Sequence, residues 1–245
     1  MHIVIFGATS AIAHSLAITY AQENNHAFTL IGRNEKRLST CKDELLALGA
    51  SRVVLKIDSF SNLQEIEQVF QSIIHEEGDM DIAILAHGSL TDQERAKTDI
   101  RYLLEEFTLN AISHIVLSQM IVNHFNAIGR GILLGIGSVA GERGRKGNYA
   151  YGSAKSAMAT FLSGLRHANT NPNIRIMTIK PGFVATPMTA HLPSSPLFVS
   201  PDFIAKEIRR GIDQNIEHMY IPSYWRLIMM IIRAIPEALF KKINI

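Results

Sequence analysis

Cysteine is nearly absent from this sequence of 245 residues, in which Cys41 is the only one. A single thiol excludes an internal disulfide framework, the usual support of small secreted domains, and is typical of a reducing compartment. An excess of one charge sign is also missing, because 24 basic and 22 acidic residues give a net charge of +2. We therefore expect neither a disordered polyelectrolyte nor a nucleic-acid partner.

Long apolar runs are missing as well. The N-terminal run ends at Gly7 and lacks a basic flank, so it does not fit a signal peptide and is typical of a buried first strand. The most apolar part of residues 224–245 is far shorter than the about 20 residues that span a bilayer. These absences favour a globular protein of the cytoplasm.

The histidines, ten in number, form no metal-ligand pattern. None of them has the helical two-histidine spacing with a glutamate that a zinc hydrolase uses, and there are no cysteine pairs. We therefore expect no metal site.

The sequence does contain an alternation of short apolar runs with longer stretches of helical period. Its length predicts one domain, and 47% hydrophobic residues are enough for a large core. Runs that are apolar throughout indicate strands covered on both faces, and the helices between them indicate right-handed crossovers. The predicted fold class is therefore α/β, a doubly wound Rossmann-type parallel sheet with helices on both faces in a single domain. The predicted strands are residues 2–6, 27–31, 53–57, 81–86, 132–136 and 174–179.

Three helix starts carry capping signals. Asn34 is the predicted cap of the helix that follows the second strand. Ser61 with Gln64 forms a predicted capping box for the next helix, and Ser200 followed by Pro201 starts another. These local signals agree with the alternation of strands and helices.

The first predicted strand leads into Gly7-Ala8-Thr9-Ser10-Ala11-Ile12-Ala13, a turn of mostly small residues. Its predicted cofactor-binding positions are Gly7, Thr9, Ser10, Ala11 and Ile12. Small side chains allow backbone N–H groups and the positive end of the helix to approach a pyrophosphate. The alternative is an ordinary tight turn between a strand and a helix. The turn alone does not decide between these two interpretations.

Two residues at strand ends bear on the choice of cofactor. Arg33 follows the second strand, where an acidic residue would bind the ribose of NAD and an arginine would bind the 2′-phosphate of NADP. NADP(H) is therefore the preferred cofactor, with NAD(H) as the alternative. Asp58 closes the third strand, where its carboxylate would accept a hydrogen bond from the adenine amino group. The competing interpretations are a solvated arginine and a helix-entry aspartate.

The most informative set is Ser138, Tyr151 and Lys155. A spacing of four residues places Tyr151 and Lys155 on one helix face, where the ammonium would lower a phenol pKa that is ordinarily about 10. Ser138 follows the fifth strand at the carboxyl edge of the sheet, where open α/β folds bind ligands. The sequence therefore predicts a proton-transfer site that contains these three residues.

Over roughly residues 1 to 220, the chain resembles the single-domain branch of the short-chain dehydrogenase/reductase family. Five landmarks occur in the family's order, which is much more specific than any one of them. They are the turn at Gly7, Arg33, Asn110 in Thr108-Leu109-Asn110-Ala111, the set Ser138/Tyr151/Lys155, and the segment from Lys180-Pro181-Gly182 to Thr186.

This resemblance implies a role for each matching residue. Tyr151 would be the catalytic acid/base, Lys155 would lower its pKa and hold the nicotinamide ribose, and Ser138 would orient the substrate. Asn110 would support a water-linked proton path behind Lys155. The other cofactor-binding positions that the resemblance implies are Ala86, Gly88, Pro181, Gly182, Val184 and Thr186.

The chain departs from the family pattern in two turns. Ala11 and Ala13 stand where the phosphate loop usually has glycines, so the pose or affinity of the cofactor would change. Ala86-His87-Gly88 stands where the family usually has Asn-Ala-Gly, so this turn lacks a backbone-bonding asparagine.

Two further segments, a basic loop and the C-terminal tail, each allow two interpretations. Arg143, Arg145 and Lys146 either attract a phosphorylated substrate or belong to a solvated loop. Residues 224–245 carry four basic residues and one acidic residue beside an apolar run. This basic amphipathic tail, which follows a catalytic domain of residues 1–223, either lies on a membrane surface at the inner face or packs on protein.

The basic loop and the tail resemble one branch of the family in particular, which contains the keto-reductase half of decaprenylphosphoryl-ribose 2′-epimerase. The resemblance rests on Gly141-Glu142-Arg143, Tyr151-Gly152-Ser153 and the Arg/Pro-containing tail. It implies a lipid-linked sugar as substrate. The region that would select the substrate, residues 188–200, is a long loop of the kind that often forms a mobile lid.

The leading hypothesis is an NADP(H)-dependent oxidoreductase that interconverts a secondary alcohol and a ketone. The substrate would be a hydrophobic small molecule or a lipid-linked one, with a keto-sugar among the candidates. The alternative is a catalytically silent dinucleotide-binding or scaffold protein with the same fold, which the two alanines of the phosphate loop make conceivable. The family resemblance also implies a homodimer or homotetramer.

Overall fold

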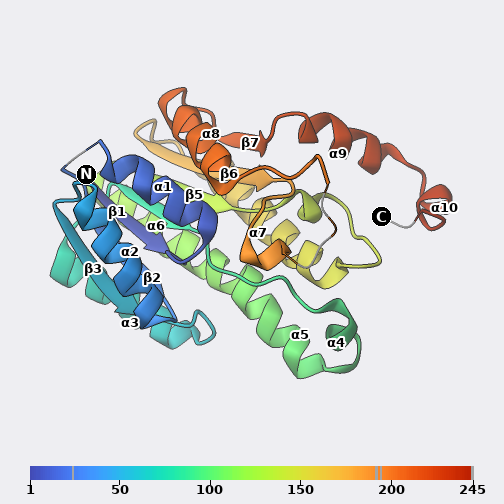
Figure 1. The fold of residues 1–245 in the computed structure, drawn as a ribbon, viewed down its shortest axis with the longest axis horizontal. Helices are drawn as coiled ribbons and strands as arrows, with labels where there is room; N and C mark the ends of the chain where they lie inside the picture. The colour runs from blue at the N-terminus through green and yellow to red at the C-terminus, as the bar shows by residue number, and fades with distance from the viewer. Residues whose placement is uncertain (24, 191–192, 194, 244–245) are drawn as a thin grey trace.

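Seven parallel strands form one sheet in the order β3-β2-β1-β4-β5-β6-β7 (Figure 1). The computed structural model describes residues 1–23, 25–190, 193 and 195–243. The predicted single α/β domain is confirmed, and each of the six predicted strands is present within two residues of its expected ends. The strands are β1 (His2–Phe6), β2 (Ala27–Gly32), β3 (Arg52–Ile57), β4 (Ile82–Leu85), β5 (Gly131–Ile136), β6 (Ile174–Pro181) and β7 (His218–Ile221).

Helices cover both faces of the sheet, as the continuous apolar character of the strands predicts (Figure 1). One face packs against α1 (Ala11–Ala21), α2 (Glu35–Ala47) and α8 (Pro201–Asp213). The other face packs against α3 (Leu63–Glu77), α6 (Ser113–Ile128) and α7 (Tyr149–Ala168). Two shorter helices, α4 (Gln93–Thr98) and α5 (Ile100–Phe107), precede the π-helical turn η1 (Thr108–Ile112).

The helix caps confirm two of the three predicted starts. The side chain of Asn34 accepts a hydrogen bond from the N–H of Arg37, and that of Ser200 accepts one from the N–H of Phe203. The predicted capping box of Ser61 with Gln64 is wrong by one residue, because Asn62 is the cap of α3. Asparagine and serine are about equally good caps. The sequence therefore does not show which of the adjacent residues Ser61 and Asn62 caps the helix.

The order of the strands creates a switch point, because the chain moves outward in one direction from β1 and in the other from β4. Ligands of open α/β sheets bind beside the carboxyl ends of the strands at such a point. The turn at Gly7 follows β1, and the turn of Ala86 and Gly88 follows β4. The fold therefore brings two of the predicted cofactor-binding segments together.

The C-terminal segment forms α9 (Trp225–Ala234) and α10 (Glu237–Phe240), which extend beyond β7 at one end of the molecule (Figure 1). One face of α9 packs inward, because Trp225 is 3% exposed and Met229 is fully buried. The indole lies directly on Gly182, where a Cβ would be 1.8 Å from Nε1. The tail therefore contacts the segment that follows β6, and residues 244 and 245 of the predicted tail lie outside the described residues.

Arg143 fastens the end of this tail to the rest of the fold. Its Nη1 donates to the carbonyl oxygens of Ile232 and Ile235, each at 2.6 Å, and its Nη2 bonds to Glu237. The guanidinium also lies 3.7 Å from the ring centroid of Phe240. Among the described residues, no helix is both long enough and apolar enough to cross a membrane.

Candidate active site

The three predicted catalytic residues come together beside the carboxyl end of β5. Ser138 begins the 3-10 turn η2 (Val139–Glu142), and its Oγ accepts a hydrogen bond from the N–H of Ala140 at 3.1 Å. Tyr151 lies in the first turn of α7, and the Nζ of Lys155 is 5.9 Å from the centroid of its ring. The Ser138 side chain lies close enough to the phenol of Tyr151 to lower the pKa of that phenol.

Two glycines allow η2 to lie directly on α7. A Cβ at Gly152 would be 2.8 Å from the carbonyl oxygen of Ala140, and a Cβ at Gly141 would be 2.8 Å from the backbone nitrogen of Ser156. Contacts this short with backbone atoms require the glycine hydrogen at both positions. The glycines therefore set the separation between the turn that carries Ser138 and the helix that carries Tyr151.

Burial dominates the electrostatics of the site. It raises the pKa of Tyr151 to about 12, although the Ser138 side chain opposes the rise. It lowers the pKa of Lys155 to about 8, and the Lys155 Nζ donates to the carbonyl oxygen of Ile136 at 3.2 Å. Lys155 is not among the causes of this shift, so the expectation that its ammonium lowers the phenol pKa stays a prediction. Loss of hydration is the larger cause, and it disfavours the charged form of both groups.

Asn110 is fully buried in the π-helical turn η1, beside the site. Its Oδ1 accepts a hydrogen bond from the N–H of Ser89 at 3.1 Å, and its Nδ2 donates to the backbone carbonyl and the carboxylate of Glu106. That carboxylate also accepts hydrogen bonds from the hydroxyl groups of Ser89 and Thr91. Sequence analysis missed Glu106, and the only signal for it is its position four residues before Asn110.

The turn without the usual asparagine is held by a stack of three rings. The imidazole of His87 lies between the rings of Phe60 and His114, with centroid distances of 4.1 and 3.7 Å. Its Nε2 lies 2.8 Å from the hydroxyl of Ser113. Burial lowers the pKa of His87 to about 3, so the ring is neutral at physiological pH. Stacking and this hydrogen bond therefore stabilise the turn at Gly88.

The turn after β1 fits a dinucleotide phosphate. Gly7 has φ +91°, and a Cβ there would be 2.3 Å from the nitrogen of His87, so only glycine fits between the two turns. No side chain caps the N-terminus of α1 in the described chain, which leaves the first N–H groups of the helix for an anion. Thr9, Ser10, Ala11 and Ile12 all lie at this N-terminus. The methyl group of Ala11 is half-buried there.

The adenine end of the predicted site has one exposed and one buried residue. Arg33 is exposed after β2, and the neighbouring strand β3 ends just before Asp58. Asp58 is buried, accepts a hydrogen bond from the N–H of Phe60, and has a pKa raised by burial. Sequence analysis missed Arg37, whose Nη2 donates to the carbonyl oxygen of Thr9 at 3.1 Å. No local sequence signal predicts this contact.

The predicted nicotinamide side follows β6. Pro181 ends that strand, and the N–H of Gly182 donates to the carbonyl oxygen of Ile221. Val184 forms an isolated parallel bridge with Val199, and Thr186 begins the 3-10 turn η3 (Pro187–Thr189). The predicted substrate loop thus folds back on the segment that follows β6, while its residues 191, 192 and 194 lie outside the described part.

The three basic residues of the loop before α7 do not share one role. Arg143 fastens the tail, Lys146 is exposed, and Arg145 is half-buried with its Nη2 3.5 Å from the sulfur of Met229. In the chain as described, no group of three or more histidine, cysteine, aspartate or glutamate side chains is arranged to hold a metal ion.

Comparisons with known proteins bear on the family of the chain. A family model described as short chain dehydrogenase matches residues 1–196. An uncharacterized oxidoreductase of Mycobacterium tuberculosis is 31% identical over 240 residues, which cover 98% of this chain and 96% of that protein. The NADP-dependent 3-hydroxy acid dehydrogenase of Schizosaccharomyces pombe is 31% identical over 186 residues, or 75% of this chain and 71% of that one.

Solved structures show the same fold. A short-chain dehydrogenase from Sphingobium yanoikuyae in complex with NADPH superposes with a TM-score of 0.81 at 20% identity, covering 97% of each chain. An actinorhodin polyketide ketoreductase variant with NADPH gives a TM-score of 0.79 at 18% identity, covering 90% of this chain and 95% of that one.

Proposed function

Since the chain belongs to the short-chain dehydrogenase/reductase family and is an NAD(P)-dependent oxidoreductase, we propose that it uses NADP(H) to interconvert a ketone and a secondary alcohol. The observation that carries this proposal is the placement of Ser138 and Lys155 around the phenol of Tyr151. We assign a hydrophobic substrate, either a simple ketone or a lipid-linked keto-sugar. Apolar side chains beside the site support that choice: Val139, Phe183, Leu197, Trp225 and Met229.

In the proposed reduction, Tyr151 donates its proton to the carbonyl oxygen, and Ser138 holds the same oxygen by a hydrogen bond. A phenol with a pKa of about 12 is protonated at neutral pH, which is the state that this donation needs. The Lys155 ammonium stabilises the tyrosinate that forms and binds the nicotinamide ribose. When bound, the nicotinamide would supply or accept the hydride, and its oxidised form would bring a positive charge into the site.

The first test replaces Tyr151 by phenylalanine, which removes the proton donor and keeps the ring. We expect kcat with a panel of apolar ketones to fall by about 100-fold or more, while the Kd for NADPH stays unchanged. Loss of NADPH absorbance measures turnover, and protein fluorescence measures binding.

Tyr149→Phe is the matched control, because Tyr149 is exposed and has Ser153 rather than a lysine four residues on. Unchanged turnover in Tyr151→Phe would refute the catalytic assignment. Tight NADPH binding by the wild-type chain without turnover of any ketone would support the silent binding protein instead.

We assign the preference for NADP(H) to Arg33. Arg37 lies beside the phosphate turn, where it bonds to the carbonyl oxygen of Thr9. Arg33→Ala removes a charge-assisted contact with the 2′-phosphate, so the Kd for NADPH should rise about tenfold or more and that for NADH should change little. Calorimetric titration of both cofactors measures this difference. Lys36→Ala serves as the control, since Lys36 is an exposed cation of the same helix start. Equal weakening of both cofactors by Arg33→Ala would contradict the assignment.

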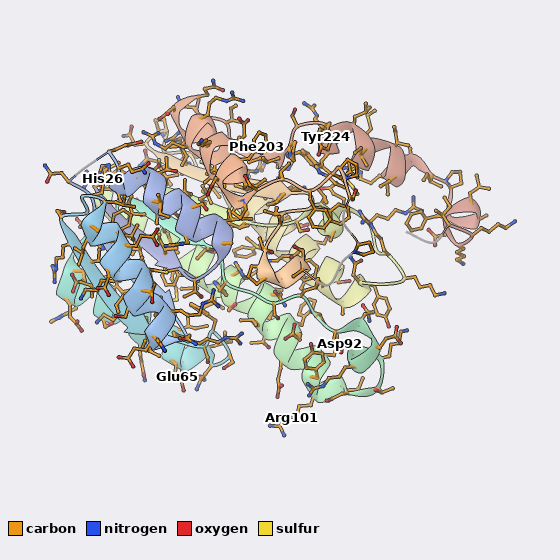
Figure 2. All side chains as sticks on the ribbon, viewed as in Figure 1. His26, Glu65, Asp92, Arg101, Phe203 and Tyr224 are labelled. Atoms are coloured by element: carbon orange, nitrogen blue, oxygen red, sulfur yellow. The ribbon has the colours of Figure 1, made fainter. Side chains whose placement is uncertain are left out.

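We further propose that the tail binds an anionic membrane surface. The outer face of α9 exposes apolar side chains, since Leu227, Met230 and Ile231 are each more than half exposed. Tyr224 stands exposed at the start of this helix (Figure 2). Arg226, Lys241 and Lys242 are exposed in the same tail, and the acidic residue of the tail, Glu237, is paired with Arg143. An apolar face with uncompensated basic residues suits anionic headgroups.

Vesicle co-sedimentation tests this surface. The wild-type chain should sediment with phosphatidylglycerol vesicles and much less with phosphatidylcholine vesicles, and the double variant Leu227→Asp/Ile231→Asp should stay in the supernatant. The control Ile100→Asp/Leu104→Asp places the same charges on α5, where both residues are 63% exposed. The membrane proposal would be overturned if the tail variant sedimented with the vesicles as much as the wild-type chain does. It would also be overturned if the variant lost self-association instead of vesicle binding.

The homodimer or homotetramer that the resemblance implies is also proposed for this chain. Helix α7 supports it with an exposed stripe of small residues that a second copy can approach closely: Ser153, Thr160, Ser163 and Gly164.

A location in the cytoplasm stays a prediction from the sequence.

A further inference from the structure

Arg145 is a half-buried cation without a counter-charge. It lies in the loop between η2 and α7, and its Nε is buried without a hydrogen-bond partner. Its Nη2 contacts the thioether sulfur of Met229, which is a weak acceptor. Burial lowers the pKa of this guanidinium, and no carboxylate of the described chain lies within salt-bridge distance of it.

Three other cations beside the tail, by contrast, are paired. Arg143 bonds to Glu237 and to the carbonyl oxygens at the end of α9. Lys180 and Arg233 both bond to the buried carboxylate of Glu142. A guanidinium withdrawn from water costs free energy unless an anion compensates it, so the exception at Arg145 calls for an anion that the chain does not supply.

Contacts link Arg145 to the turn that carries Ser138. Met229, which it touches, packs in one cluster with Trp225 and Val139, the residue after Ser138. In this cluster the indole Nε1 of Trp225 is also buried without an acceptor.

A further unpaired donor lies next to Tyr151. The Oε1 of Gln93 accepts a hydrogen bond from the N–H of Ala150, while its Nε2 is buried without a partner. With the Nε of Arg145, three buried N–H donors without acceptors therefore lie on residues linked by contacts to the neighbours of Ser138 and Tyr151.

We propose that Arg145 binds an anionic oxygen group of the substrate, a phosphate or a carboxylate, while the ketone lies at Tyr151. The inference rests on the proposed function and narrows the substrate class to amphiphilic ketones with one anionic group. The planar guanidinium can bind such a group through two parallel hydrogen bonds, and Trp225 and Gln93 can donate to further oxygens. The apolar cluster around Met229 would contact the rest of the molecule.

Matched probes test this assignment by binding, independently of turnover. Calorimetry with the NADP⁺-loaded protein measures the Kd of 5-oxohexyl phosphate, 5-oxohexanoate and its uncharged methyl ester. The wild-type chain should bind at least one anion about tenfold or more tightly than the ester, and Arg145→Met should abolish that preference without weakening the ester. The two anions distinguish a phosphate from a carboxylate subsite. Lys146→Met, a change of the adjacent exposed cation, should leave all three Kd values unchanged.

A folding control accompanies the binding data. Arg145→Met removes an uncompensated half-buried charge, so its Tm without probe should equal or exceed that of the wild-type chain. Equal affinity of the wild-type chain for anions and ester, no binding of either anion up to about 10 mM, or an undiminished anion preference in Arg145→Met would each overturn the proposal. Anion binding without turnover would instead refute the proposed reaction and leave the subsite standing.

Discussion

The whole site depends on a backbone contact between the turn after β5 and the first turns of α7. Gly141 and Gly152 face backbone atoms across this contact, and no side chain separates the two elements there. The turn carries Ser138 and the helix carries Tyr151 and Lys155, so a separation of even one methyl group would part the hydroxyl from the phenol. The position of the reacting groups therefore depends on glycine at both positions. Any other residue would add a Cβ and push the turn and the helix apart.

Around this contact, the cations divide into two kinds. Those that fasten the tail have carboxylate partners, as Arg233 does with Glu142 and Arg143 does with Glu237. Lys155 and Arg145 are withdrawn from water without such partners, and burial lowers the pKa of both. In the proposed function, the tyrosinate at Lys155 and an anionic substrate group at Arg145 offset the cost of burying these two cations, which is a common trade of stability for function.

Local patterns predicted much of this architecture, because strands buried on both faces are apolar throughout and a four-residue spacing fixes one helix face. The strand β7 escaped prediction because it has only four residues at the sheet edge, with His218 exposed. Three site residues were not predicted, because each acts through a contact with a residue on another turn or element. They are Glu106, Gln93 and Arg37. The direction of the Tyr151 pKa shift depends on how deeply packing buries the phenol, which spacing does not reveal.

The central claim is that Tyr151 is a protonated donor in the chain alone and becomes a usable acid/base when the cofactor is bound. Its pKa can be measured directly by NMR on protein labelled at the tyrosine ζ carbon, with Tyr151→Phe to identify the resonance. The account predicts a pKa of about 12 without cofactor and a clear fall when NADP⁺ binds. A phenol pKa that does not change on NADP⁺ binding would contradict the account.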